Sequence, residues 1–94
     1  MNATLDPTAR YAPHAQAIES RLGDETVILH LERGTYFGLD VVGTIVWERL
    51  QAGDTPEDIA AHVRASFDEV PESVENDITT FLEALLENQL IERR

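Results

Sequence analysis

Cysteine is absent from this chain of 94 residues. A chain without cysteine forms no disulfide bonds, has no thiolate nucleophile and binds no metal through sulfur, and it suits a reducing compartment. No apolar run reaches the roughly 20 residues of a membrane span, and the first residues contain no apolar segment of a secretion signal. We therefore expect a cytoplasmic protein.

Positive charge is scarce. Seven arginines and no lysines stand against 18 Asp and Glu residues, and the formal net charge is −11. A protein that binds duplex nucleic acid needs a basic surface to neutralise phosphates, and anionic lipid surfaces attract basic segments for the same reason. The charge therefore argues against nucleic acid and against membrane as partners.

Catalytic motifs are also missing. His14, His30 and His62 lack the spacing of a metal site, and no serine lies in the glycine-flanked turn of a hydrolase. No glycine-rich loop that would bind phosphate is present. We expect no enzyme activity, no catalytic residue, no metal and no cofactor.

The remaining pattern is that of a small globular domain, with 43% hydrophobic residues. Residues 1–13 contain Pro7 and Pro13 and show little apolar periodicity, so we expect a flexible N-terminal tail. Residues 14–94 then form one domain.

Alternating apolar residues predict three short strands, at residues 16–22, 27–31 and 35–39. Strands of this length do not bury an apolar face alone, so the sheet should pack against the helices that follow.

The hairpin between the second and third strands admits two registers. A two-residue loop at 33–34 pairs Leu31 with Tyr36, whereas a three-residue loop at 32–34 pairs Leu31 with Thr35 and puts glycine at the left-handed bulge position. Because one register step moves every side chain to the other face, we prefer the three-residue loop, which gathers the larger apolar set on one side. This register predicts an inner face of Val27, Leu29, Leu31, Phe37 and Leu39, and an outer face of Ile28, His30 and Tyr36.

Helix signals are clear in the second half. A first helix is expected at residues 41–51, with Asp40 as its N-cap. The second helix begins at Pro56, where Thr55 and Asp58 form a capping box.

The third helix is expected from about Pro71 to Glu87, closed by Asn88 in the left-handed conformation, with Leu90-Ile91 returning as an extended segment. Its apolar stripe is wider than one-sided packing requires, so part of it should line a groove. The predicted fold class is α+β, a three-stranded antiparallel sheet followed by a three-helix bundle that resembles a winged helix.

An ordered set of features resembles the PqqD-like family of leader-recognition domains. The set comprises Tyr-Phe-Gly-Leu at 36–39, a polar cap at Asp40, Ile-Val-Trp at 45–47, Thr-Pro-Glu-Asp-Ile at 55–59, and the spacing of Pro-Glu-Ser-Val-Glu-Asn-Asp-Ile to Phe-Leu at 71–82. The resemblance covers most of the chain, roughly Val27 to Glu92. The family often has Asn where this chain has Asp40.

The resemblance implies a precursor peptide that binds as an extra strand on the third strand, in a cleft walled by the third helix. A free-standing chain of this size most resembles the RiPP recognition element of lasso peptide biosynthesis, which works beside a leader peptidase and a macrolactam-forming cyclase. The alternative within the family is the PqqD-type peptide carrier, which serves a radical-SAM enzyme.

The physical properties of the third strand agree with this implication. Residues 35–39 contain neither charge nor proline, the devices that normally protect an edge strand, and Gly38 lets another backbone approach. Such an edge is suited to strand addition. The alternatives are an edge covered by the N-terminal tail or by Leu90-Ile91, and a homodimer through the same edge.

The candidate peptide-binding residues come from the third strand and from the apolar stripe of the third helix. They are Thr35, Tyr36, Phe37, Gly38, Leu39, Val74, Asp77, Ile78, Phe81, Leu82 and Leu85. Asp77 and Glu83 either flank the groove and pair with a cation of the ligand or are ordinary solvated charges. Tyr36 either stacks on a ligand ring or packs across the strand.

Two hypotheses come from other classes of protein. A winged-helix nucleic-acid-binding domain needs a basic recognition helix, and the third helix has no basic residue. A carrier protein needs a serine for phosphopantetheine; Ser73 lies near a helix start but not in an Asp-Ser-Leu motif.

Overall fold

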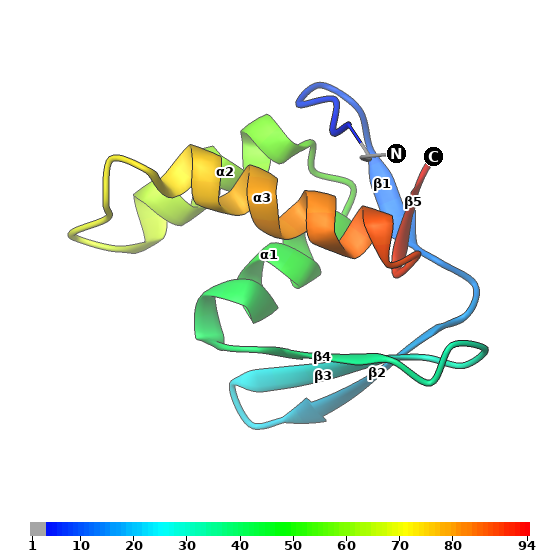
Figure 1. Cartoon of the computed structure of the whole chain (residues 1–94). Coiled ribbons are helices and arrows are strands. Elements are labelled where there is room, and N and C mark those ends of the chain that lie inside the picture. The colour runs from blue at the N-terminus through cyan, green and yellow to red at the C-terminus, as the bar shows by residue number, and fades with distance from the viewer. Residues whose placement is uncertain (1–3) are drawn as a thin grey trace.

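The computed structural model describes residues 4–94. In chain order the elements are β1 (Tyr11–Pro13), β2 (Ala17–Leu22), β3 (Glu25–His30), β4 (Tyr36–Leu39), α1 (Val41–Gln51), α2 (Pro56–Ser66), α3 (Val74–Glu87) and β5 (Ile91–Arg93). Strands β2, β3 and β4 form an antiparallel sheet in that order, and β1 pairs with β5 in a separate ribbon. Figure 1 shows the helices gathered on one side of the sheet. The predicted α+β class is confirmed.

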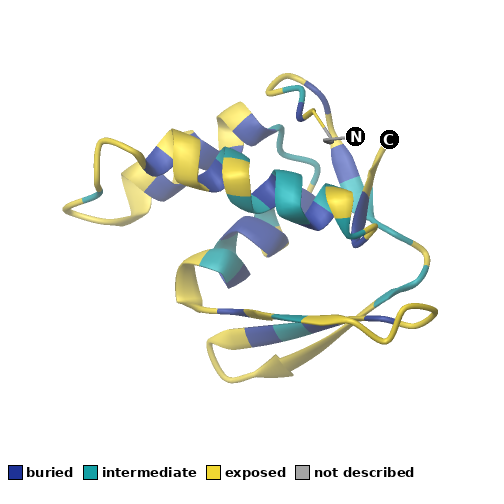
Figure 2. Cartoon of the chain, viewed as in Figure 1, coloured by how far each residue is buried: buried dark blue, intermediate teal, exposed yellow. Residues whose placement is uncertain are grey.

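The core lies between the helices and the inner face of the sheet (Figure 2). Strand β3 and each helix contribute a side chain that is at most 2% exposed: Ile28 from β3, Trp47 from α1, Ile59 from α2 and Leu82 from α3. Burying one side chain of this size is worth about 1.5–3 kcal/mol, so packing of the helices stabilises a sheet that is too small to stand alone.

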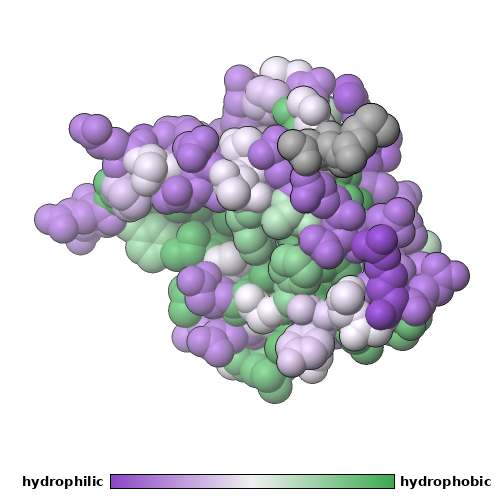
Figure 3. Space-filling model, in the orientation of Figure 1, coloured by the Kyte–Doolittle hydropathy of each residue, from purple (hydrophilic) through white to green (hydrophobic). Residues whose placement is uncertain are grey.

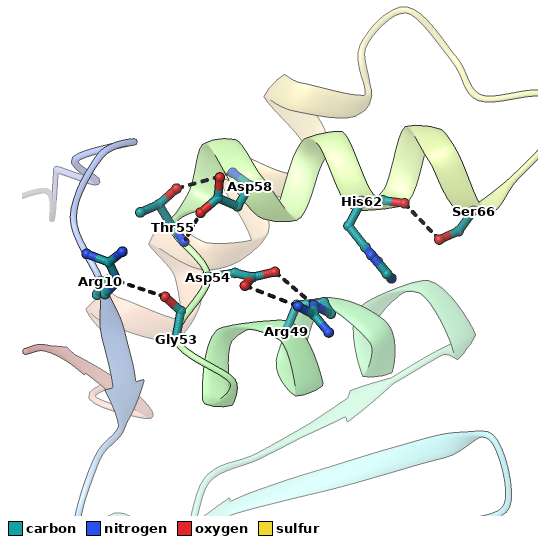
Figure 4. Close-up of polar contacts among 8 residues, drawn as sticks. All are labelled: Arg10, Arg49, Gly53, Asp54, Thr55, Asp58, His62 and Ser66. Carbon is teal, nitrogen blue, oxygen red and sulfur yellow. Dashed lines mark hydrogen bonds and ion pairs between the residues drawn. The ribbon is translucent and has the colours of Figure 1, made fainter.

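Polar contacts define the connection between α1 and α2 (Figure 4). Arg49 forms a two-pronged ion pair with Asp54, at 2.8 and 3.2 Å. Thr55 and Asp58 cap each other's backbone N–H groups, both at 3.2 Å. The second helix therefore begins at Pro56, as the capping box predicts.

The β3–β4 hairpin shows that the predicted register is wrong. Ile28 pairs with Phe37, and His30 N–H donates to the Thr35 carbonyl at 2.9 Å. The loop therefore contains four residues, 31–34, rather than three.

The longer loop inverts the predicted faces of β3. Thr26, Ile28 and His30 are buried, each at most 1% exposed, whereas Leu29 and Leu31 are 37% and 54% exposed. On β4 the prediction holds, because Leu39 is buried and Tyr36 is exposed.

Hydrogen bonds at two of the buried polar side chains favour this register, whereas His30 Nε2 has no partner within residues 4–94. The Thr44 hydroxyl of α1 donates to the Thr26 hydroxyl at 3.1 Å, and His30 Nδ1 accepts from the Arg33 N–H at 3.2 Å. A buried polar group costs little when it is hydrogen-bonded, and the Thr26 partner is supplied by a helix that local sequence does not place.

Helix α3 ends at Glu87 as predicted but begins at Val74, later than expected. The left-handed residue after it is Gln89, with φ of 57°, and not Asn88. The Asn88 side-chain amide donates to the Ala84 carbonyl at 2.8 Å, so this residue caps the helix and the next one turns the chain.

The N-terminal segment that was expected to be irregular packs on the rest of the domain from Leu5 onward. Leu5, Ala9 and Tyr11 are buried, and the Tyr11 hydroxyl accepts from the Asp6 N–H at 3.0 Å. Its strand β1 pairs with β5, from the other end of the chain. The domain boundary at residue 13 stays a prediction, and residues 1–3 of the expected tail lie outside the described residues.

Candidate functional site

Among the described residues, 4–94, β4 is an edge strand of the sheet with no further strand beside it. Its strand neighbour is β3, and the two segments that were offered as cover, the N-terminal tail and the C-terminal extended segment, pair with each other instead. The strand carries no charge and no proline, so nothing in its sequence protects the edge.

Alternation of hydrogen bonds identifies the free backbone groups of β4. His30 N–H donates to the Thr35 carbonyl at 2.9 Å, and bonded and non-bonded positions alternate along an antiparallel pair. The odd-numbered residues of β4 therefore bond to β3. Tyr36 and Gly38 direct their N–H and C=O groups away from the sheet.

A groove of about 550 Å³ lies beside the end of β4. Its walls are the last residues of β4, the first turns of α1, the end of α2, the loop between α2 and α3, and the first half of α3. Figure 3 shows hydrophobic atoms exposed between α3 and the sheet and hydrophilic atoms around them. An apolar groove next to an unpaired strand is the arrangement that strand addition requires.

The structure brings part of the predicted set together at this groove. The predicted residues in its lining are Gly38, Leu39, Val74, Asp77, Ile78 and Phe81. Thr35 and Tyr36 are exposed along the strand outside the lining, and Phe37 is half-buried on the inner side.

Leu82 and Leu85 were predicted to line the groove and do not. Both side chains are fully buried, with exposed fractions of 0%. The wide stripe of α3 therefore serves two purposes, since its first half faces the groove and the rest completes the core. Of the two alternatives for Glu83, a place beside the groove is not what the structure shows, because the residue is not in the lining and its carboxylate accepts from the Leu5 N–H at 3.5 Å.

Sequence reasoning missed the groove residues outside β4 and α3. They are Asp40 at the N-cap of α1, Val42, Gly43 and Val46 of α1, Val63 of α2, and Phe67, Glu69, Val70 and Pro71 of the α2–α3 loop. A signal was present in the loop, where its apolar residues interrupt an acidic and polar segment between two helices.

Gly43 forms the junction of β4, α1 and α3. A Cβ atom at this position would lie 3.3 Å from both Leu39 Cβ and Asp40 Oδ1, and 3.6 Å from Phe81 Cζ. Its N–H donates to Asp40 Oδ1 at 2.8 Å, so the cap of α1 is also part of the groove wall.

An ion pair joins the two helices that wall the groove. Arg64 of α2 contacts the carboxylate of Glu75 on α3, at 2.7 Å through Nη2. The hydrogen bonds from Arg64 lower the pKa of Glu75 to about 2. Both side chains are about half exposed, so the pair positions the helices more than it stabilises the fold.

Over residues 4–94 no cluster of three or more His, Asp or Glu side chains is arranged to hold a metal ion. Within the same residues no helix has the length and apolar character that a membrane crossing requires.

The family model for coenzyme PQQ synthesis protein D (PqqD) matches residues 25–91. The chain belongs to the PqqD family. The matched region starts at β3 and ends at the first residue of β5, so it includes the open edge, the helices and the whole groove.

Solved structures with a similar fold include two complexes. TbiB1 in complex with the TbiA(beta) leader peptide has 38% sequence identity and a TM-score of 0.78, and the match covers 86% of this chain and 94% of that chain. Lasso peptide synthetase B1 complexed with the leader peptide has 21% identity and a TM-score of 0.78, over 89% of this chain and 99% of that chain, and this likeness is one of fold alone. A search of curated protein sequences found no match.

Proposed function

We propose that this chain binds the leader segment of a ribosomally made precursor peptide as an added strand on β4, beside α3. The observation that carries the proposal is the unprotected β4 edge next to a largely apolar groove. The similarity to TbiB1, which was solved with a leader peptide, supports a leader as the occupant.

Strand addition divides recognition between backbone and side chains. The outward N–H and C=O groups of Tyr36 and Gly38 supply hydrogen bonds that any peptide can make, and the groove selects the side chains on the inner side of the added strand. Each side chain that the groove removes from water adds up to about 1.5–3 kcal/mol.

In this proposal the chain is an adaptor in the cytoplasm and carries out no chemistry. It presents the bound precursor to a leader peptidase and a cyclase-type enzyme of lasso peptide maturation. Holding the substrate next to an enzyme raises its local concentration, so micromolar affinity, about −8 kcal/mol, is sufficient.

A second candidate within the family is a PqqD-type carrier that serves a radical-SAM enzyme, and the family description favours it. The peptide partner distinguishes the two, because a lasso precursor is bound in one case and the quinone precursor in the other. A nucleic-acid partner is disfavoured by the net charge of −11 and by an α3 without basic residues.

The test is a titration with the fluorescently labelled synthetic leader of the precursor encoded beside this chain's gene. We expect saturable binding that weakens on Phe81→Ala, which removes a ring from the groove. Ile18→Ala is the matched control, because Ile18 is a large apolar residue 49% exposed on β2, the opposite edge strand.

Absence of saturable binding to the leader by the unchanged protein would overturn the proposal. A homodimer through the β4 edge would compete with the leader, so sedimentation with and without peptide also measures whether the edge is shared with a second copy.

A further inference from the structure

The groove beside β4 combines an apolar surface with acidic residues and has no basic residue in its lining. Asp40, Glu69 and Asp77 line it, and all three are exposed. They come from three separate elements: the N-cap of α1, the α2–α3 loop and α3. Three acidic residues from different parts of the chain thus line one groove.

These carboxylates are not neutralised within residues 4–94, where no ion pair involves them. Asp40 Oδ1 accepts from the Gly43 N–H and Asp77 Oδ2 accepts from the Ser73 hydroxyl, so each keeps its second oxygen for another partner. The arginine on the adjoining helix, Arg64, is already paired with Glu75. Within residues 4–94, no basic side chain neutralises the negative charge of these three residues at the groove.

We infer that the peptide bound at β4 carries a basic residue next to its apolar anchor, and that Asp40, Glu69 and Asp77 together bind this residue. The inference rests on the proposed function, because it assumes a peptide in the groove. An apolar side chain buried in the groove supplies affinity, and a cation at its acidic edge supplies selection and faster association. A peptide with an acidic residue at the same place is repelled by all three carboxylates.

The variant Asp40→Asn, Glu69→Gln, Asp77→Asn tests the inference with side chains of unchanged size. Asparagine is also an effective N-cap, so α1 keeps its start. The matched control is Asp24→Asn, Glu57→Gln, Glu87→Gln. It changes the net charge by the same amount at exposed carboxylates outside the groove lining and outside the observed ion pairs.

The probe is the labelled synthetic leader used above, together with versions in which each Lys or Arg is replaced by Ala. An exposed ion pair is worth about a 1.5- to 5-fold change in affinity, and the groove variant removes up to three such contacts at once. We therefore expect it to bind about tenfold more weakly, and the control variant to bind nearly as the unchanged protein does. One Lys or Arg replacement should weaken binding to the unchanged protein and have no effect with the groove variant. Salt should weaken binding to the unchanged protein more than to the groove variant.

Equal weakening in the groove and control variants overturns the inference, because it shows a general effect of net charge. The inference is also overturned if no Lys or Arg replacement in the leader changes its affinity for the unchanged protein. In both cases saturable binding leaves the proposed function standing, whereas complete absence of binding removes the function and the inference together.

Discussion

Replacement of Gly38 by proline is the most direct test of strand addition. The Gly38 N–H points away from β3, so proline at this position removes a donor that the folded protein does not use. Edge strands accept proline where the N–H faces solvent, and nothing lies within 4 Å of a Cβ atom built at Gly38. The change should therefore leave the fold intact and block the incoming strand.

The expected loss of affinity follows from one hydrogen bond. Its net value is about 0.5–1.5 kcal/mol, and a peptide carbonyl left without a partner costs about 1–3 kcal/mol more. Since about 1.4 kcal/mol is a factor of ten, Gly38→Pro should weaken leader binding by about one to three orders of magnitude.

Fluorescence anisotropy of the labelled leader measures the affinity, and fluorescence of Trp47, which is 2% exposed, reports whether the protein is folded. Glu19→Pro is the matched control. The N–H of Glu19 also points away from β3, but at the opposite edge of the sheet, on β2. A folded Gly38→Pro protein that binds the leader with unchanged affinity would refute strand addition at β4.

Three further substitutions distinguish residues that stabilise the fold from residues that bind the leader. Tyr11→Ala removes a buried ring and should lower the free energy of unfolding by about 3–5 kcal/mol in a urea titration. Leu85→Ala should cost about 2–5 kcal/mol of unfolding free energy, yet leave the leader affinity of the folded protein unchanged, because the side chain lies in the core. Glu75→Gln should lower the melting temperature above about pH 5, since the pKa of Glu75, held near 2 by Arg64, is depressed in the folded state. The difference from the unchanged protein should then close as the pH falls from about 4.5 to about 2, because the carboxylate takes up its proton first in the unfolded state and only near pH 2 in the folded state.

For each of these three predictions, one specific result would contradict the reasoning. A Tyr11→Ala protein with unchanged stability would mean that the N-terminal segment is a dispensable tail. Loss of affinity in folded Leu85→Ala would place this side chain in the groove after all. A melting difference for Glu75→Gln that persists at low pH would show that the ion pair with Arg64 is not its cause.

The starts of α1 and α2 were predictable because their signals are local, whereas α3, whose N-cap Ser73 makes no side-chain hydrogen bond, begins later than predicted. Asp40 caps a backbone N–H three residues away, and the Thr55–Asp58 capping box lies within four residues. The extent of α1 and the beginning of α2 agree with the sequence prediction. The end of α3 was predicted at the correct residue, although the left-handed position fell on Gln89 and not on Asn88.

The candidate site was partly predictable for the same reason. The open edge follows from a strand without charge or proline, and part of the apolar stripe of α3 does line the groove. The division of that stripe between groove and core was not predictable, because the period is identical for Ile78, which lines the groove although it is 5% exposed, and Leu82, which is fully buried outside the lining. The groove residues of α1, α2 and the following loop depend on how the helices pack.

The amino-acid sequence by itself therefore determined the class of fold, the N-caps of α1 and α2, the negative charge and the unprotected character of β4, since these depend on composition and on neighbours a few residues away. Tertiary structure alone decided the face of β3 that is buried, through the contact between Thr26 and Thr44, and the pairing of β1 with β5 from opposite ends of the chain. It also decided which carboxylates meet at the groove. These features depend on partners that are distant in sequence, and a local pattern cannot specify a partner that only the packed helices bring within reach.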